Sequence, residues 1–261
     1  MSVSLIISTY NRPDALFRVL ESVELQTKIP DEIIIADDGS DDMTKKCITD
    51  FNKFSTLKLI HSWQNDKGFR AAKSRNKAIA KSSCDYIILV DGDMILHNKF
   101  IEDHIHHAEL GFFVQGSRVL INKQVTNKIL ENCLSSFSFL SKGISNRKNA
   151  IYSVFFAKFF VKKKNYIKGI KTCNFAFYKK DCIEINGFNN YFEGWGREDT
   201  EFVVRLLNKG INRKNIHFNL IQFHLWHKNS SRNLLHHNEA ILLNSINNSL
   251  DWCENGISKY L

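Results

Sequence analysis

The chain of 261 residues is 43% hydrophobic and 24% charged, a globular composition that excludes a mainly disordered or fibrous protein. Its formal net charge of +9 leaves nucleic acid, an anionic membrane surface and a phosphate-bearing substrate as candidate partners. No apolar stretch reaches the ~18–20 residues that a membrane-spanning helix needs, so the sequence predicts no transmembrane segment.

The first hundred residues alternate between strand and helix patterns. Apolar, β-branched runs predict strands over residues 3–8, 32–36, 57–60 and 86–90. Apolar spacing predicts helices over residues 14–26 and 71–81, and the acidic pair Asp41-Asp42 suits the start of another. Strand-helix units of this length predict a mostly parallel sheet covered by helices on both faces, with ligands at the carboxyl ends of its strands.

Beyond about residue 110 the pattern loosens. Residues 114–120 suit one more strand, and residues 229–261 suit helical, partly amphipathic structure. The stretch 158–171 is rich in lysine and mixes with aromatic residues. A solvated basic surface is the favoured interpretation, and the alternative is a surface that contacts anionic lipid or a lipid-linked acceptor.

The triplet Asp91-Gly92-Asp93 directly follows the apolar run at residues 86–90. Two carboxylates at the end of a buried strand are costly unless a cation lies between them. A divalent ion that holds a phosphate would supply this charge, because hard oxygen ligands suit Mg²⁺ and Mn²⁺. Taken alone, the same triplet is also an ordinary turn after a strand.

Two further polar clusters follow the predicted strands. Thr9-Tyr10-Asn11 combines a hydroxyl, an aromatic ring and an amide that could frame a planar base, or could simply cap the next helix. Asp37-Asp38-Gly39-Ser40 offers a carboxylate to a nucleobase or a ribose, or forms a helix-capping loop. Both interpretations stay open for each cluster.

A basic cluster surrounds the predicted start of the helix at residues 71–81. Lys67, Arg70, Lys73 and Arg75 lie at or near this helix N-terminus, which is a natural place for a diphosphate. The alternative is an exposed basic helix face.

The last cluster is Gly194-Trp195-Gly196-Arg197-Glu198-Asp199, which precedes an apolar helix. Acidic residues at a helix start are favourable in themselves, so capping alone could explain them. Glycines on both sides of a tryptophan favour a functional interpretation, in which the ring lies against a ligand.

Taken in this order, the clusters Ser-Thr-Tyr-Asn, Asp-Asp-Gly-Ser, Ala-x-x-x-Arg-Asn, Asp-x-Asp and Gly-Trp-Gly-Arg-Glu-Asp resemble the inverting family 2 glycosyltransferases. The last block is similar to a C-terminal motif of β-1,4-galactosyltransferases and bacterial chondroitin polymerases. The resemblance covers residues 2–228. It implies an α/β GT-A fold with a Rossmann-like, mostly parallel sheet and a C-terminal helical extension. The expected division is a nucleotide-sugar-binding half (1–110), an acceptor-binding and catalytic half (111–228) and a helical tail (229–261).

The resemblance further implies a metal-dependent transfer, with inversion, of a hexose or N-acetylhexosamine. The donor would be a UDP-sugar, the cofactor Mn²⁺ or Mg²⁺, and the acceptor a hydroxyl of a glycan or lipid-linked glycan. Within the donor site, Thr9 and Tyr10 would line the uracil, Arg75 would approach the diphosphate and Asp91 the ribose. The full set of expected donor-binding residues is Thr9, Tyr10, Asn11, Asp38, Lys67, Arg75 and Asp91.

The remaining roles fall on the acidic and histidine residues. By the same resemblance, Asp199 would be the catalytic base, and Trp195 and Glu198 would bind the acceptor. Asp93 would be a metal ligand together with His227, for which His224 is the alternative. The other histidines, including His106-His107 and His236-His237, are expected to be structural.

The class of protein has two alternatives, a nucleotidyltransferase and a non-catalytic sugar-nucleotide-binding protein. No nucleic-acid partner is expected, because the basic residues are scattered and the acidic strand-end loops would repel phosphates. The six cysteines form no C-x-x-C pair and are expected to be reduced and mostly buried. A cytoplasmic location, or a peripheral one at the inner face of the cell membrane, would suit synthesis of a bacterial surface polysaccharide or lipooligosaccharide.

Overall fold

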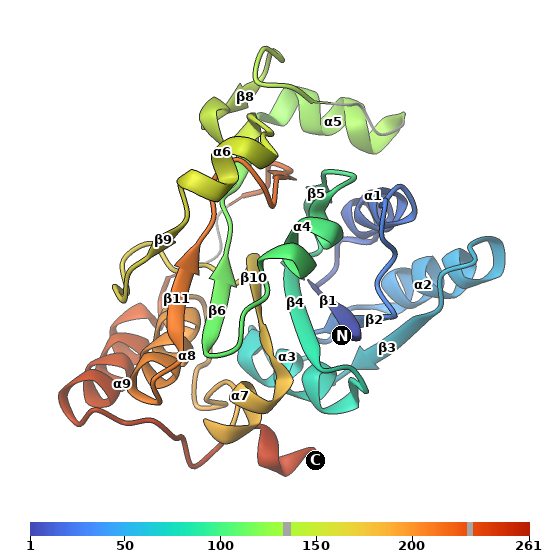
Figure 1. Ribbon diagram of the computed structural model, residues 1–261. Coiled ribbons are helices and arrows are strands. Elements are labelled where there is room, and N and C mark those ends of the chain that lie inside the picture. Colours follow the sequence, from blue (N-terminus) through green and yellow to red (C-terminus); the bar gives the residue numbers. More distant parts are fainter. Residues whose placement is uncertain (133–136, 229–231) are drawn as a thin grey trace.

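A central sheet crosses the molecule, with helices on both faces (Figure 1). The computed structural model describes residues 1–132, 137–228 and 232–261. Within them the strands of this sheet are, in spatial order, β3 (Leu59–Trp63), β2 (Glu32–Asp37), β1 (Val3–Thr9), β4 (Tyr86–Asp91), β10 (Asn174–Tyr178), β6 (Phe112–Gln115), β11 (Asn212–Asn215) and β9 (Lys162–Lys163). Only β10 and β9 run against the direction of β1. The predicted α/β fold with a mostly parallel sheet is confirmed.

A smaller sheet continues beyond the end of β4. Its order is β5 (Met94–Leu96), β12 (Gln222–His224), β7 (Val119–Ile121) and β8 (Ile144–Ser145). The antiparallel pairing of β5 with β12 sets Met94 opposite His224, and the Leu225 N–H donates to the Asp93 carbonyl over 3.0 Å. This sheet therefore brings a distant histidine-bearing segment to the Asp-Gly-Asp triplet.

The helices are α1 (Pro13–Glu24), α2 (Asp42–Phe54), α3 (Ala71–Lys81), α4 (Phe100–His107), α5 (Lys123–Glu131), α6 (Val154–Phe159), α7 (Lys179–Glu184), α8 (Glu198–Asn208) and α9 (Leu235–Asn247), with 3₁₀ turns at Arg147–Ala150 and Ile257–Lys259. Proline at the first position suits the start of α1, and the Asp41 side chain caps α2 by accepting from the Met43 N–H. The predicted helix over 71–81 is confirmed as α3.

Alternating residues of the strands fill two cores, one on each face of the sheet. Leu5 and Ile7 of β1 belong to the core that contains Leu16 of α1, whereas Ile6 belongs to the core that contains Phe202 of α8. This alternation is the side-chain period of a strand buried on both faces. It places α1 and α2 on one face and α3 and α8 on the other.

The single strand expected over residues 114–120 is wrong, because the structure divides this segment between the two sheets as β6 and β7. The break lies at Gly116, where a Cβ atom would meet the Asn174 side chain at 2.4 Å. Asn174 Nδ2 donates to the carbonyls of Ser117 and Leu220, both at 2.7 Å. Asn174 thus satisfies the backbone where the chain leaves the central sheet.

Two other boundaries differ from expectation. The strand expected over 57–60 is β3, which runs to Trp63 because it pairs with β2 as far as Asp37. The C-terminal extension contains α9, but the chain then turns back and buries Ile257 in the core. Within the described residues, the cysteines are free, Cys47 is half-buried and the others are buried. Cys133 lies outside the described residues.

Candidate active site

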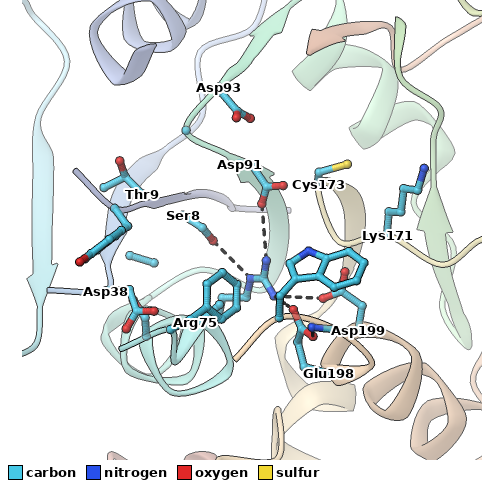
Figure 2. A pocket seen from close by; sticks show the side chains of 18 of the residues that line it. Ser8, Thr9, Asp38, Arg75, Asp91, Asp93, Lys171, Cys173, Glu198 and Asp199 are labelled. Carbon is cyan, nitrogen blue, oxygen red and sulfur yellow. Dashed lines mark hydrogen bonds and ion pairs between the residues drawn. The ribbon is translucent and has the colours of Figure 1, made fainter. Parts of the chain in front are cut away.

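A cavity of about 660 Å³ opens at the carboxyl ends of β1 and β4, beside the N-termini of α3 and α8 (Figure 2). Pre-formed concave sites of this size are where small ligands bind, and this edge of a parallel sheet is where they are expected. The sequence-predicted residues that line it are Thr9, Tyr10, Asp38, Arg75, Asp91, Asp93, Trp195, Glu198, Asp199 and His227.

Asn11 and Lys67 are not part of the cavity lining. Asn11 adopts a left-handed backbone conformation (φ 47°), and its side-chain oxygen accepts from the Asp41 N–H over 2.9 Å. Its own N–H donates to the Ser40 hydroxyl over 2.9 Å. Asn11 therefore ties the loop after β1 to the loop after β2, while Lys67 is exposed.

One corner of the cavity is formed by the strand-end residues Thr9, Tyr10 and Asp38. Asp38 is buried and accepts from Gln64 Nε2 and the Arg70 N–H, both over 2.6 Å. Burial raises the pKa of Asp38, although these two donors oppose the shift. Tyr10 is half-exposed and leaves its ring accessible to a planar ligand.

At the centre, the buried Arg75 guanidinium lies among three carboxylates (Figure 2). Its nitrogens lie 3.0 Å from Asp199 Oδ1, 3.5 Å from Asp91 Oδ1 and 3.9 Å from Glu198 Oε1. Burial alone would lower the Arg75 pKa, but the three carboxylates raise it overall. Removing Arg75 would leave three acidic groups crowded together without their shared cation.

Asp199 is held from two further directions by Thr172. The Thr172 N–H donates to Asp199 Oδ2 over 3.0 Å, and its hydroxyl donates to Oδ1 over 2.8 Å. Together with Arg75, these bonds give each carboxylate oxygen at least one donor. The carboxylate is therefore oriented before any ligand binds.

Glu198, the first residue of α8, is buried beside Asp199. Burial raises the pKa of Glu198 to about 7, the Asp199 charge adds to the shift, and Arg75 opposes it. Its Oε2 atom accepts from the Gly196 N–H over 3.1 Å. A carboxyl with this pKa can exchange a proton near neutral pH.

The loop before α8 presents Trp195 to the cavity. Gly196 has φ 111°, a conformation that side-chain-bearing residues rarely adopt, so the glycine is required by the backbone. Trp195 remains 40% exposed, and the Arg232 guanidinium lies 5.0 Å from its ring centroid. From α9, Asn238 Nδ2 donates to the Glu193 carbonyl over 3.0 Å and braces the loop.

At the other end of the cavity, Asp93, His224 and His227 converge. Their ligand atoms all lie within 4.8 Å of one another, and each histidine Nε2 lies 3.5 Å from Asp93 Oδ2. Arg12 Nη1 lies 3.2 Å from the same oxygen. Burial opposes ionisation of Asp93, but His224, His227 and Arg12 lower its pKa overall. His227 and His224 were alternatives for the second metal ligand in the sequence, and in the structure both lie beside Asp93.

This donor set fits a divalent transition metal. Asp93 Oδ1 is buried and has no hydrogen-bond partner among the described residues, which is a costly arrangement for a carboxylate oxygen. His227 Nδ1 lies 2.6 Å from the Lys228 carbonyl and donates its proton there, which leaves Nε2 of the neutral ring available as a metal ligand beside Asp93. One carboxylate and two imidazoles could therefore hold Mn²⁺.

The sequence did not point to five of the residues that line the cavity, namely Arg12, Arg118, Lys171, Cys173 and Arg232. It also did not point to Thr172, which lies behind the lining and donates to Asp199. Lys171 to Cys173 directly precede β10, whose antiparallel direction puts its first residues beside the end of β4. The pattern of the basic stretch gave no signal for this placement. Burial raises the pKa of Cys173 to about 12, so this thiol is not a thiolate nucleophile.

Comparisons with known proteins agree with this architecture. The model of glycosyl transferase family 2 matches residues 4–184, and a model described as the N-terminal domain of galactosyltransferase matches residues 152–228. The chain is 25% identical to chondroitin synthase of Escherichia coli over 236 residues, 80% of this chain and 32% of that protein. It is 35% identical to the O-antigen chain rhamnosyltransferase RfbN of Salmonella typhimurium over 197 residues, 72% and 56% of the two chains. The chain thus spans about a third and about half of these relatives.

Solved structures show the same fold at low sequence identity. S. aureus TarS superposes with a TM-score of 0.65 over 95% of this chain and 40% of its own, at 15% identity. Residues 1–349 of TarS in complex with UDP-GlcNAc give a TM-score of 0.61 over 88% and 60% of the two chains, at 16% identity. In residues 1–132, 137–228 and 232–261, none of the helices combines the length and apolar character needed to span a bilayer.

Proposed function

The chain belongs to glycosyltransferase family 2, and we propose that it transfers a hexose or N-acetylhexosamine, with inversion, from a UDP-sugar to a hydroxyl of a glycan. The observation that carries the proposal is the shared cavity, which holds a pre-oriented carboxylate at one end and the Asp93–His224–His227 cluster at the other. A general base and a leaving-group site in one cavity are what glycosyl transfer from a nucleotide sugar requires.

Asp199 is the proposed base. Its carboxylate would accept the proton of the acceptor hydroxyl as that oxygen attacks the anomeric carbon. Thr172 and Arg75 keep the carboxylate in one orientation, so little reorganisation is needed at the moment of transfer. Trp195 and Glu198 line the same side of the cavity and would contact the acceptor.

The nucleotide would occupy the opposite wall. Tyr10 would offer its accessible ring and Asp38 its buried carboxylate to the base, while Asp91, which also lines the cavity, would contact the ribose. Arg12, Arg118 and Lys171 line the cavity and supply positive charge for the diphosphate. Because Arg75 is already enclosed by three carboxylates, its proposed role changes from a diphosphate contact to the counter-ion of the base.

Asp93, His224 and His227 would hold Mn²⁺ or Mg²⁺, with the nitrogen ligands favouring Mn²⁺. The bound cation would neutralise charge that develops on the departing diphosphate. Arg12 provides part of this positive charge from the protein itself, since it lies beside Asp93.

The biological setting is inferred from the relatives. By their names, chondroitin synthase and the O-antigen chain rhamnosyltransferase build polysaccharide chains, and TarS is crystallised with UDP-GlcNAc. A UDP-sugar donor and a glycan or lipid-linked glycan acceptor, in the synthesis of a bacterial surface polysaccharide or lipooligosaccharide, agree with these names.

The test is a screen of nucleotide-diphosphate sugars with Mn²⁺, in which donor hydrolysis and thermal stabilisation are measured. We expect one or a few UDP-sugars to raise the Tm and to be hydrolysed slowly, since water can replace the acceptor. If no nucleotide sugar stabilises or is consumed, while nucleoside triphosphates are, the chain would act as a nucleotidyltransferase instead.

A further inference from the structure

The basic excess of the chain is concentrated in one segment. Residues 132–180 contain eleven lysines and arginines and no aspartate or glutamate. The rest of the chain holds the other 25 basic residues against 27 acidic ones, a balance of −2. The net charge of +9 is therefore a property of this segment and not of the molecule as a whole.

The same segment exposes a cluster of aromatic side chains on and after α6. Phe155 is 65% exposed, Phe159 is 71% exposed, and their ring centroids are 5.0 Å apart. Phe156 and Phe160 are each about half-exposed, and both contact Phe218. Of the six residues of α6, only Ala157 is buried. A contiguous exposed apolar patch of this kind marks an interaction surface.

Lysines lie between and directly after these phenylalanines in the sequence. Lys158, Lys162 and Lys164 are exposed, and none of them forms an ion pair with a carboxylate in the part of the chain that the structure describes. Lys163, by contrast, pairs with Glu109. The unpaired ammonium groups and the exposed rings all fall within residues 155–164, and we call this exposed set the aromatic–basic face, defined as Phe155, Phe156, Phe159, Phe160, Lys158, Lys162 and Lys164.

We propose that the aromatic–basic face docks on an anionic lipid bilayer. Phenylalanine rings insert at the boundary of headgroups and acyl chains, and lysines beside them are attracted to anionic headgroups. A second copy of the chain fits poorly, because it would bring two strongly cationic segments together. A soluble polyanion would satisfy the lysines but would leave the phenylalanines in water.

The aromatic–basic face is also the surface that would meet a lipid-linked acceptor, but its docking on a bilayer does not depend on the transfer reaction. The chain runs from the face through β9 to Lys171, which lines the cavity, so the two sites are joined by a short segment. Membrane binding can be measured without any donor or acceptor. Failure of the lipid proposal would therefore leave the glycosyltransferase assignment intact, and the reverse also holds.

The experiment is co-sedimentation of the full chain with vesicles of phosphatidylcholine, alone or mixed with phosphatidylglycerol. We expect binding to the mixed vesicles that is at least about tenfold tighter and that weakens with salt. The double variant Phe155→Ser/Phe159→Ser should bind at least about tenfold more weakly. Replacing Lys158, Lys162 and Lys164 by glutamine should weaken binding about 100-fold, at about fivefold for each lysine near the surface.

Matched controls come from the opposite end of the chain. Phe54→Ser removes a phenylalanine that is 89% exposed at the end of α2, and glutamines at Lys28, Lys45 and Lys58 remove the same charge from exposed sites. Both controls should bind vesicles like wild type. Unchanged binding in the face variants, equal binding to neutral vesicles, or a dimer in size-exclusion chromatography that only the face variants abolish would overturn the proposal. Circular dichroism confirms that each variant is folded.

Discussion

The carboxylates at the two ends of the cavity differ in how fully their oxygens are hydrogen-bonded. Asp199 accepts hydrogen bonds from Thr172 and Arg75, so both of its oxygens are satisfied within the protein. Asp93 has one buried oxygen without a hydrogen-bond partner in the described residues, while two imidazoles lie 3.5 Å from the other. The proposed base is therefore fully hydrogen-bonded within the protein, whereas the proposed metal ligand keeps one carboxylate oxygen without a donor among the described residues.

This difference agrees with the two roles proposed for Asp199 and Asp93, a general base and a metal ligand. A fixed orientation favours catalysis by the proposed base, because proton transfer requires the carboxylate to be aligned with the acceptor hydroxyl. A metal site gains specificity from a ligand set that is unsatisfied without the ion. The sharpest tests therefore remove one carboxylate at a time and ask whether turnover or ligand binding is lost.

The largest effect is expected for Asp199→Asn. The amide cannot accept the acceptor proton, so we expect kcat to fall by about 10²–10⁴-fold. Donor and Mn²⁺ affinity, measured by calorimetry, should stay within about threefold of wild type, since the other end of the cavity is untouched. The half-exposed Asp251→Asn, outside the cavity, serves as the control and should retain full turnover. Wild-type turnover in purified Asp199→Asn would contradict the assignment of the base.

Asp93→Ala should mainly weaken metal binding, in contrast to Asp199→Asn, which should mainly lower turnover. Removing the carboxylate that joins the two imidazoles should weaken Mn²⁺ binding by at least about 100-fold, because even outer-sphere partners contribute 10–100-fold. Calorimetry with Mn²⁺ alone measures this without turnover. Asp50→Ala on α2, at a partly exposed carboxylate outside the cavity, is the matched control. Equal Mn²⁺ affinity in Asp93→Ala and wild type would remove the metal site from the proposal.

Single histidine variants test whether both imidazoles bind the metal. Because both imidazoles face Asp93, His224→Ala and His227→Ala should each weaken Mn²⁺ binding, and by similar factors of about 10–100. His106→Ala on α4, a histidine outside the cavity, is the control. A loss in only one of the two variants would show that the other imidazole is a neighbour and not a ligand.

Much of the fold could be predicted because its signals are local. The helix α3 was predicted with its observed ends, and β1 and β4 follow from uninterrupted apolar runs. The division of residues 114–120 into two strands could not be predicted, since it depends on Asn174, nearly sixty residues later in the chain, filling the space beside Gly116. Patterns in one segment do not report which distant side chain will pack there.

The same limit applies to the site. Acidic clusters at strand and helix ends identified Asp93 and Asp199, whereas Thr172 was missed because only the antiparallel entry of β10 carries it to Asp199. The choice between His224 and His227 was also beyond the sequence. The pairing of β12 with β5 places the first beside Asp93, and the following backbone returns the second to it.

A smaller effect on turnover is expected when the base loses one of its donors. Thr172→Val keeps the N–H bond to Asp199 but removes the hydroxyl, so kcat should fall by about 10-fold, as expected for a hydrogen bond to a charged group. The KM for the donor should not change. Thr172→Ser restores the hydroxyl and should recover most of the loss. A similar loss in both variants would indicate a packing role instead of a positioning one.

The smallest effect concerns Glu198, a carboxyl beside Asp199 whose charged form is disfavoured by burial. Glu198 has a pKa raised by burial from 4.5 to about 7, so its charged form destabilises the folded state above about pH 7 and this cost disappears as the pH falls towards about 4.5. Glu198→Gln removes the charge and should stabilise the protein at pH 8 by about 1–3 kcal/mol, while acceptor binding weakens. The gain in Tm should shrink as the pH falls towards 5, whereas exposed Glu24→Gln should shift Tm little at either pH. A gain that is the same at both pH values would mean that the ionisation of Glu198 is not its source, and that the acidic end of the cavity carries no stored electrostatic cost.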